Sequence, residues 1–411
     1  MSKVSVLDVL LYGEPIGTLT NVGGDRTLFA FTDGYIKDEK RSTLGLGFKD
    51  EFGGLITNFR PYQTRTMPFF SNLLPEGHLR SYLAEKAQVN PEREFFLLWA
   101  LGRDLPGAIT IQPVDGEALP PNSIDEEGEG AKEREAPENA LHFSLAGVQL
   151  KFSAVQEASG GLTIPASGVG GSWIVKLPSR EFEAVPENEF SMMTLAQQVG
   201  MDVPQVDLIE VAAIKNLPDG IDAIGKQAFI IERFDRLSDG SAVHIEDFAQ
   251  VFGVYPDKKY KTAKLANIAQ VLAAEGRDED ISEFVRRVVF NALIGNGDMH
   301  LKNWSLIYRD RRSASLAPAY DFVSTIPYIP NDTMALNVSR TKNFAAFDAD
   351  ELSHFAASAA IPEKVVFDVA KETVAGFQEA WASEKANLPM SKDVRQSIDR
   401  HLKELPLAKM A

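Results

Sequence analysis

The most constraining feature of the sequence is a polar, glycine-containing loop between a strongly apolar helix and an apolar strand. Apolar residues recur at helical spacing over residues 281–293, and residues 304–308 are typical of a strand. The loop between them, Gly295–Trp304, contains Asp298 and Asn303, and its two glycines suit a tight, exposed turn. The chain is therefore expected to fold so that a core helix presents these polar side chains at its end.

This loop has the composition of a phosphoryl-transfer site. Asn303 follows Asp298 at the spacing of the catalytic loop in protein kinases. Phosphoryl transfer requires a carboxylate that orients and deprotonates the attacking hydroxyl, and a neutral oxygen ligand for magnesium close by. The loop therefore predicts Asp298 as the catalytic base, Asn303 as a ligand of Mg²⁺, and ATP as the phosphoryl donor.

A second carboxylate supports this interpretation. Residues 316–322 are typical of a strand that carries Asp321, about twenty residues after Asp298, where kinases place their main magnesium ligand. A single aspartate of this kind is more often a turn or cap residue, but three such side chains in this order favour function. Within the loop, His300 is expected to make a structural hydrogen bond, because no second histidine has the spacing of a metal ligand.

Lys176 is the predicted phosphate-binding lysine. It lies in an otherwise apolar strand over residues 173–177, where a lysine is unfavourable unless it is paired or faces a ligand. The alternative is an edge-strand lysine that faces water. A helix follows over residues 186–199, and Glu189 on that helix is the expected ion-pair partner of Lys176.

Two further segments suit nucleotide binding. Near Ser144, the small-residue turn Ala146, Gly147 and Val148 can hold phosphates through backbone N–H groups. An apolar strand over residues 227–232 then runs into a charged segment, as a kinase hinge does. Its backbone is expected to bind adenine around two residues, Glu232 and Phe234.

The chain is expected to be an α+β protein with a bilobed, protein-kinase-like fold. A small N-terminal α+β subdomain precedes a mixed N-lobe and a mostly helical C-lobe. Strands are expected at residues 28–31 and 56–59, and amphipathic helices at 362–385 and 391–404, the latter capped by Ser391. The expected units are residues 1–112, an acidic flexible linker at 113–140, the N-lobe at 141–240 and the C-lobe at 241–411.

Composition excludes several classes of protein. The chain has no cysteine, which rules out disulfides, thiolate metal sites and cysteine nucleophiles. A net charge of -16 argues against a broad nucleic-acid surface. No apolar run approaches the roughly 20 residues that span a bilayer, so a cytoplasmic protein without membrane contact is expected.

Taken together, these motifs resemble the HipA family, and the resemblance covers nearly the whole chain. The N-terminal unit contributes the segments Phe70–Pro75 and Gly102–Asp104. The remaining motifs are Ser144-x-Ala146-Gly147-x-Gln149-x-Lys151, Lys176-Leu177-Pro178, Asn188-Glu189-Phe190, Glu232–Arg236, Asp298-x-His300-x-Lys302-Asn303 and Tyr320-Asp321.

The resemblance implies a serine/threonine protein kinase that is the toxin of a bacterial toxin–antitoxin pair. It implies a protein substrate in translation, such as an aminoacyl-tRNA synthetase, and autophosphorylation on Ser144. It also implies that Lys302 takes part in catalysis with Asp298. The expected partner is a HipB-like helix-turn-helix antitoxin, so that DNA is contacted only indirectly.

Two alternatives stay open from the sequence. One is a small-molecule phosphotransferase of the aminoglycoside-kinase type, which uses the same aspartate–asparagine spacing. The other is a catalytically silent corepressor that binds an antitoxin. The loop around Ser144 and the N-terminal unit favour a protein kinase over the first alternative. The presence of Lys176, Asp298, Asn303 and Asp321 argues against the second.

Overall fold

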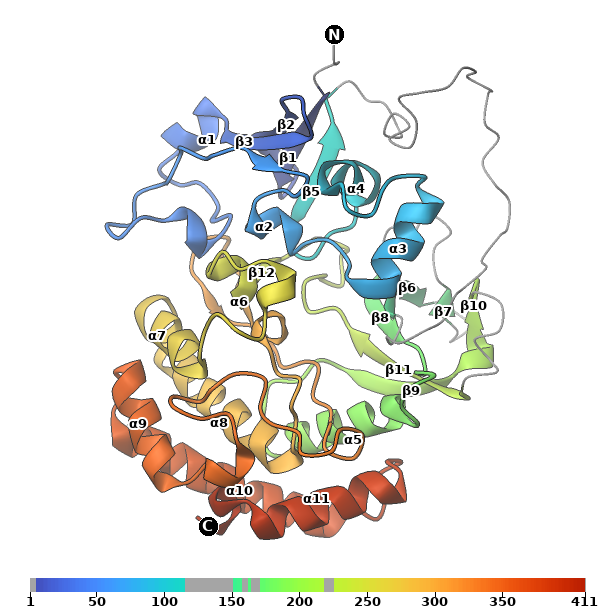
Figure 1. Cartoon of the computed structure of the whole chain (residues 1–411), viewed down its shortest axis with the longest axis vertical. Coiled ribbons are helices and arrows are strands. Elements are labelled where there is room, and N and C mark those ends of the chain that lie inside the picture. Colours follow the sequence, from blue (N-terminus) through green and yellow to red (C-terminus); the bar gives the residue numbers. More distant parts are fainter. Residues whose placement is uncertain (1–4, 115–150, 157–161, 164–170, 218–224, 411) are drawn as a thin grey trace.

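The computed structural model describes residues 5–114, 151–156, 162–163, 171–217 and 225–410. The fold is α+β, with a small sheet at one end of the molecule, a second sheet in the middle and a helical region at the other end (Figure 1). The predicted linker at 113–140 lies almost entirely outside the described residues.

The N-terminal unit is a five-stranded antiparallel sheet in the order β4-β3-β2-β1-β5. Alternate residues of β1 are buried, as expected for a sheet with one face on a core. The expected strand at 56–59 is wrong: only a single bridge joins Lys49 to Leu55, and Phe59 packs on the aromatic core of this unit. The elements are β1 Ser5–Leu11, β2 Glu14–Asn21, β3 Arg26–Phe31, α1 Asp33–Lys37, β4 Tyr62–Gln63, α2 Pro68–Ser71, α3 Gly77–Lys86, α4 Glu94–Leu101 and β5 Ile109–Pro113.

The central sheet has six strands in the order β10-β7-β6-β8-β11-β9. In this sheet β11 lies between β8 and β9, and the register pairs Phe229 with Lys176. Helix α5 packs against β9 and β11 and against α10 of the helical region, so it links the sheet to the larger core. The elements are β6 Lys151–Gln156, β7 Leu162–Thr163, β8 Trp173–Lys176, α5 Val185–Gln198, β9 Val206–Glu210, β10 Ile214–Lys215 and β11 Gln227–Glu232.

The helical region is built around α8. This helix is buried from Arg287 to Ile294 and packs against α7, α10 and α11. Strong burial on several sides explains the apolar character of its last two turns. The helices are α6 Phe248–Val251, α7 Leu265–Glu275, α8 Asp278–Ile294, α9 Ala349–Ala359, α10 Glu363–Glu384 and α11 Lys392–Glu404.

A three-stranded sheet, β12-β13-β14, joins the helical region to the N-terminal unit; its strands are β12 His244–Asp247, β13 Ser305–Tyr308 and β14 Ser315–Leu316. The Nε2 atom of His244 lies 2.7 Å from the carbonyl of Leu44, and the N–H of Leu46 donates to Glu246 at 2.8 Å. The expected strand over 316–322 is wrong beyond Leu316, because the chain turns away into irregular backbone.

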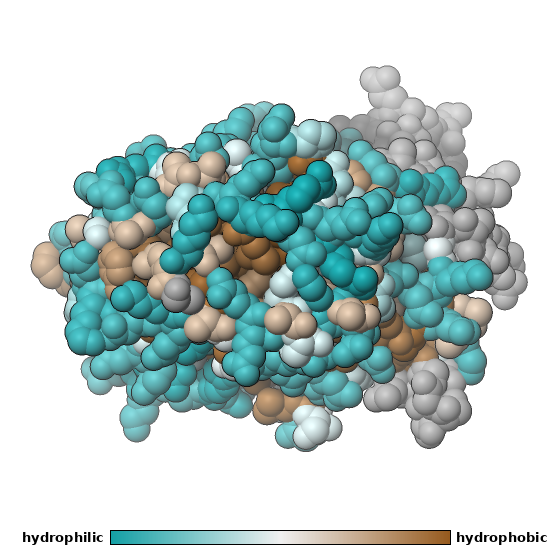
Figure 2. Space-filling model, turned by 90° about the horizontal axis from the view of Figure 1, so that it is seen from below, coloured by the Kyte–Doolittle hydropathy of each residue, from teal (hydrophilic) through white to brown (hydrophobic). Residues whose placement is uncertain are grey.

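Helix α11 closes the end of the molecule. It buries Val394 and Ile398 and leaves most of its charged side chains outside. Figure 2 views this end and shows a mainly hydrophilic surface with smaller hydrophobic areas between the polar side chains. As predicted, Ser391 caps the helix: its side chain accepts a hydrogen bond from the N–H of Val394 at 3.2 Å.

Candidate active site

The polar loop begins where Gly295 ends α8 in the left-handed conformation, with φ 65°. A Cβ atom at this position would lie 2.5 Å from Ile326, so glycine is required by both space and backbone angle. This turn ends the buried helix and leads directly into the polar loop, whose Asp298 and Lys302 are only partly buried.

Hydrogen bonds within the loop fix its shape. The N–H of Asp298 donates to Asn296 at 2.9 Å, and the side chain of Asn303 donates to the carbonyl of Asp298 at 2.8 Å. Asn296 in turn donates to Asn291, in the last turns of α8, at 2.7 Å. The two predicted site residues therefore share one rigid loop, anchored to the helix that precedes it.

Lys176, at the end of β8 in the central sheet, contacts both α5 and the segment that carries Asp321. Its Nζ lies 2.5 Å from Glu189 on α5, which confirms the predicted ion pair, and it also donates to the carboxylate of Asp321. The lysine is only 8% exposed. Burial would lower the pKa of Lys176, but the two carboxylates raise it above its ordinary value, so the ammonium is charged.

Asp321 is held in an unusual backbone conformation, with φ 59°. Its carbonyl accepts a hydrogen bond from Asn296 at 3.4 Å, and the neighbouring Tyr320 hydroxyl donates to the carbonyl of Lys302 at 3.0 Å. Asn188 on α5 donates to the carbonyl of Ser324 at 2.8 Å. These contacts tie the segment of Asp321 to both the polar loop and α5.

The two aspartates differ in their electrostatics. Burial raises the pKa of Asp298, the nearby charge of Asp321 raises it further, and a hydrogen bond from Tyr260 opposes both effects. Burial also acts on Asp321, but the charges of Lys176 and Lys151, together with the hydrogen bond from Lys176, outweigh burial and lower the pKa of Asp321 to about 2. Asp321 is therefore an anion at neutral pH, beside a fixed cation.

Tyr260 is a neighbour of Asp298 that the sequence did not indicate. Its hydroxyl donates to a carboxylate oxygen of Asp298 at 2.5 Å. The ring of His300 packs edge-on against it, with 4.9 Å between the ring centres. The expected structural hydrogen bond of His300 is not found at Nδ1, which is buried and has no partner among the described residues.

Lys302 points toward the N-terminal unit. Its Nζ donates to the carbonyl of Asn72 at 2.9 Å and lies 3.0 Å from Glu76. Asp247, at the end of β12, lies at 3.9 Å. The N-terminal unit therefore reaches the same loop that carries Asp298 and Asn303.

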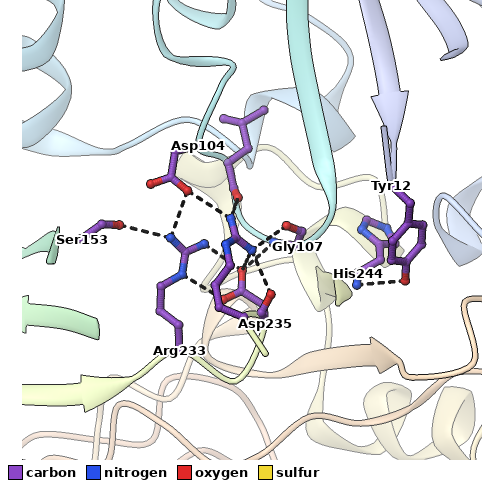
Figure 3. Close-up of polar contacts among 9 residues, drawn as sticks. Tyr12, Asp104, Gly107, Ser153, Arg233, Asp235 and His244 are labelled. Carbon is purple, nitrogen blue, oxygen red and sulfur yellow. Dashed lines mark hydrogen bonds and ion pairs between the residues drawn. The ribbon is translucent and has the colours of Figure 1, made fainter. Parts of the chain in front are cut away.

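The predicted hinge follows β11, and its residues Arg233 and Asp235 form a buried polar network. Arg233 makes a two-pronged contact with Asp235, at 2.9 Å for each oxygen, and contacts Asp104 of the N-terminal unit at 3.1 Å (Figure 3). Glu232 is exposed at the end of the strand, and the ring of Phe234 packs against Tyr320 with 5.6 Å between centres. The charges of Arg233 and Asp235 are thus structural, because buried ions require partners.

The other predicted nucleotide-binding residues cannot be placed in the same way. Ser144, Ala146, Gly147 and Val148 lie outside the described residues.

The donor set suits a hard cation. Asn303 uses its amide N–H for the carbonyl of Asp298, which leaves its amide oxygen available, and Asp321 offers a carboxylate. Carboxylate and amide oxygens are ligands that Mg²⁺ accepts, usually with bound phosphates and water completing its shell. Within the described ranges no group of three or more acidic or histidine side chains forms a self-sufficient metal site.

The fold and the site together define a kinase-like protein. The molecule has a lobed architecture and a buried Lys176–Glu189 pair, and Asp321 lies beside the loop that carries Asp298 and Asn303. Models of the HipA-like C-terminal domain and the HipA N-terminal domain match residues 143–381 and 7–112. The chain belongs to the HipA family.

Relatives agree with this assignment. "Putative kinase Y4dM" of Sinorhizobium fredii is 59% identical over 404 residues, covering 98% of this chain and 97% of the relative. The serine/threonine-protein kinase toxin HipA of Shewanella oneidensis is 27% identical over 357 residues, covering 80% and 77%. The HipA, HipB and operator DNA complex of Shewanella oneidensis shares the fold, with a TM-score of 0.71 and 22% identity over 98% of this chain and 96% of that chain.

In the described part of the chain, no helix is both long enough and apolar enough to cross a bilayer.

Proposed function

We propose that the chain is an ATP-dependent serine/threonine protein kinase and the toxin of a HipA/HipB-like pair. One observation carries the proposal: Lys176 contacts both Glu189 and Asp321 next to the loop of Asp298 and Asn303. A buried lysine between a helix glutamate and a second carboxylate matches the ion pair and metal ligand that active kinases bring together.

Each side chain has a separate role in this proposal. Lys176 neutralises phosphate charge, and Asp321 and Asn303 hold Mg²⁺, which when bound stabilises negative charge on the phosphates. Asp298 orients the acceptor hydroxyl and takes its proton. Lys302 supports the reaction from the same loop.

Nucleotide binding completes the proposed site. The backbone around Glu232 and Phe234 would contact adenine, and the N–H groups of Ala146, Gly147 and Val148 would surround the phosphates. Ser144 precedes these residues and is the proposed autophosphorylation site. A phosphate there adds roughly two negative charges near pH 7 and would oppose ATP binding.

The proposed partners follow from the family. A HipB-like helix-turn-helix antitoxin would bind the chain in the cytoplasm, and DNA would be contacted only through it. The net charge of -16 supports this indirect contact. The proposed substrate is a protein of translation, such as an aminoacyl-tRNA synthetase.

Transfer from γ-labelled ATP tests the proposal. The purified chain is incubated with Mg²⁺ and, in separate reactions, with aminoacyl-tRNA synthetases, with an aminoglycoside, or with no acceptor. We expect label on protein that is lost in Asp298→Asn. Label on the aminoglycoside alone would indicate a small-molecule phosphotransferase, and no transfer in any reaction would indicate a silent corepressor.

A further inference from the structure

Glu76 links two segments of the candidate site that are far apart in the sequence. It lies just before α3 of the N-terminal unit. One carboxylate oxygen is 3.0 Å from Nζ of Lys302, and the other is 2.8 Å from Nζ of Lys259. The N-terminal unit also accepts a hydrogen bond from Lys302 at the carbonyl of Asn72.

Each of these lysines is the chain neighbour of a residue that contacts Asp298. Lys259 precedes Tyr260, whose hydroxyl donates to the Asp298 carboxylate at 2.5 Å. Lys302 precedes Asn303, whose side chain donates to the Asp298 carbonyl at 2.8 Å. The contacts therefore form a closed ring around Asp298, and Glu76 is the member that joins its two sides.

We propose that Glu76 is a positioning residue for phosphoryl transfer, so that the N-terminal unit completes the active site of the helical region. This inference rests on the proposed kinase function. Through Lys302 and Lys259, Glu76 holds the loop of Asp298 and Asn303 against the segment of Tyr260. It does not touch the reacting groups itself.

The charges suit such a clamp. Burial would raise the pKa of Glu76, but Lys302 and Lys259 outweigh burial and lower it to about 2, so the carboxylate is charged at neutral pH. Each charged contact restricts a long side chain that would otherwise sample several rotamers. An acceptor placed even about 1 Å away from its best position can lose about a hundredfold in rate.

The two units also share an ion pair that does not include any residue of the ring around Asp298. Lys49 of the N-terminal unit lies 2.9 Å from Glu275, the last residue of α7. Because this pair links the same two units without touching the loop of Asp298, Glu275→Gln is a matched control for Glu76→Gln. Both substitutions keep shape and remove one charge.

The inference is tested by the kinetics of phosphate transfer from γ-labelled ATP to a protein acceptor. We expect Glu76→Gln to lower kcat about tenfold to a hundredfold, with the KM for ATP changed less than about twofold. Glu275→Gln should keep the kcat of the wild type. A wild-type kcat in Glu76→Gln, or an equal loss in both variants, would overturn the inference.

A double-mutant cycle with Tyr260→Phe tests whether Glu76 acts through the ring. If it does, the double variant should lose clearly less kcat than the product of the two single losses. Fully multiplicative losses would overturn the ring as the mechanism.

Hydrogen exchange separates this inference from the proposed function, because it needs no activity. Amides of residues 298–303 should exchange faster in Glu76→Gln than in Glu275→Gln or the wild type. If the wild type transfers no phosphate, the proposed function fails, yet faster exchange still supports the clamp. Unchanged exchange in Glu76→Gln overturns the clamp whatever the activity.

Discussion

At the scale of single residues, Asp321 combines strain with charge. A non-glycine residue at φ 59° costs about 1–3 kcal/mol and persists only where its surroundings determine it. Here the contact with Lys176 and the hydrogen bond from Asn296 hold the backbone of Asp321 in this conformation. Such strain at a partly buried carboxylate is expected where the direction of the side chain matters for function.

We predict that Asp321→Asn weakens magnesium-dependent ATP binding more than Asn303→Ala does. A carboxylate supplies a full charge to a hard cation, whereas an amide supplies only a dipole. Calorimetric titration with ATP at fixed Mg²⁺ measures the difference. Equal effects, or a larger effect of Asn303→Ala, would remove Asp321 from its role as the main metal ligand.

Candidate site residues inside short motifs could be recognised in the sequence, whereas the side chains that contact them from distant segments could not. Asp298 and Asn303 share one loop, and Lys176 was recognisable as a lysine in an apolar strand. Tyr260 lies 38 residues from Asp298, and the contact of Lys302 with Asn72 spans 230 residues. No local pattern indicates such partners, because only the packing of the N-terminal unit on the helical region brings them together.

At the scale of elements, the stability of α11 depends on its N-cap residue, Ser391, which could be recognised in the sequence. The hydroxyl of Ser391 satisfies the N–H of Val394, one of the donors that a helix start leaves free. We predict that Ser391→Ala lowers the free energy of unfolding by about 1 kcal/mol, whereas Ser391→Asp, which keeps an acceptor, does not. Urea unfolding of the three proteins measures this, and equal stability of all three would contradict the capping role.

Strand β12 carries a buried histidine at the junction with the N-terminal unit. His244 is fully buried, its ring stacks on Tyr308 with 5.5 Å between centres, and its Nε2 donates to Leu44. Burial lowers the pKa of His244 to about 4. The imidazole is therefore neutral in the fold, and its buried Nδ1 has no hydrogen-bond partner among the described residues.

This histidine should make folding depend on pH. Between its ordinary pKa and about 4, the unfolded chain binds a proton that the folded chain does not, so its contribution to stability falls as pH falls. We predict that the wild type loses about 3 kcal/mol relative to His244→Gln between pH 6.5 and 4. The comparison with a variant is needed because burial raises the pKa of nearby Glu246 to about 7, which has the opposite pH dependence.

Urea unfolding of both proteins across this pH range measures the difference. The exposed His354 provides a control, and His354→Gln should follow the wild type. A constant difference between the wild type and His244→Gln would show that the buried ring does not resist protonation.

The two strand predictions that were wrong, at residues 56–59 and beyond Leu316, have the same physical cause. Residues 56–59 and 317–322 have strand-like composition, but they lie where the chain packs on aromatic or polar neighbours instead of a strand edge. The spacing of apolar residues and the composition of a segment indicate that its side chains are buried. A buried segment need not form the backbone hydrogen bonds of a sheet. Helix α10, by contrast, was predictable because its apolar spacing continues over many turns.

At the scale of the whole molecule, the N-terminal unit is packed into the fold and is not a loosely tethered module. It meets the helical region at β12, through Glu76 and through the Lys49–Glu275 pair, and it meets the hinge through Asp104. The order of lobes was visible in the sequence as a strand-rich half followed by a helix-rich half. The attachment of the N-terminal unit was not, because its contacts are spread over distant side chains.

In the proposed function of the whole molecule, Asp298 directs the transfer of phosphate from ATP. Intact-mass and phosphopeptide analysis of the purified chain after incubation with Mg²⁺ and ATP tests it directly, with Asp298→Ala treated in parallel. We expect the wild type to gain phosphate on Ser144 and then to bind ATP more weakly, while Asp298→Ala folds normally and gains none. A well-folded Asp298→Ala that gains phosphate as the wild type does would contradict the claim.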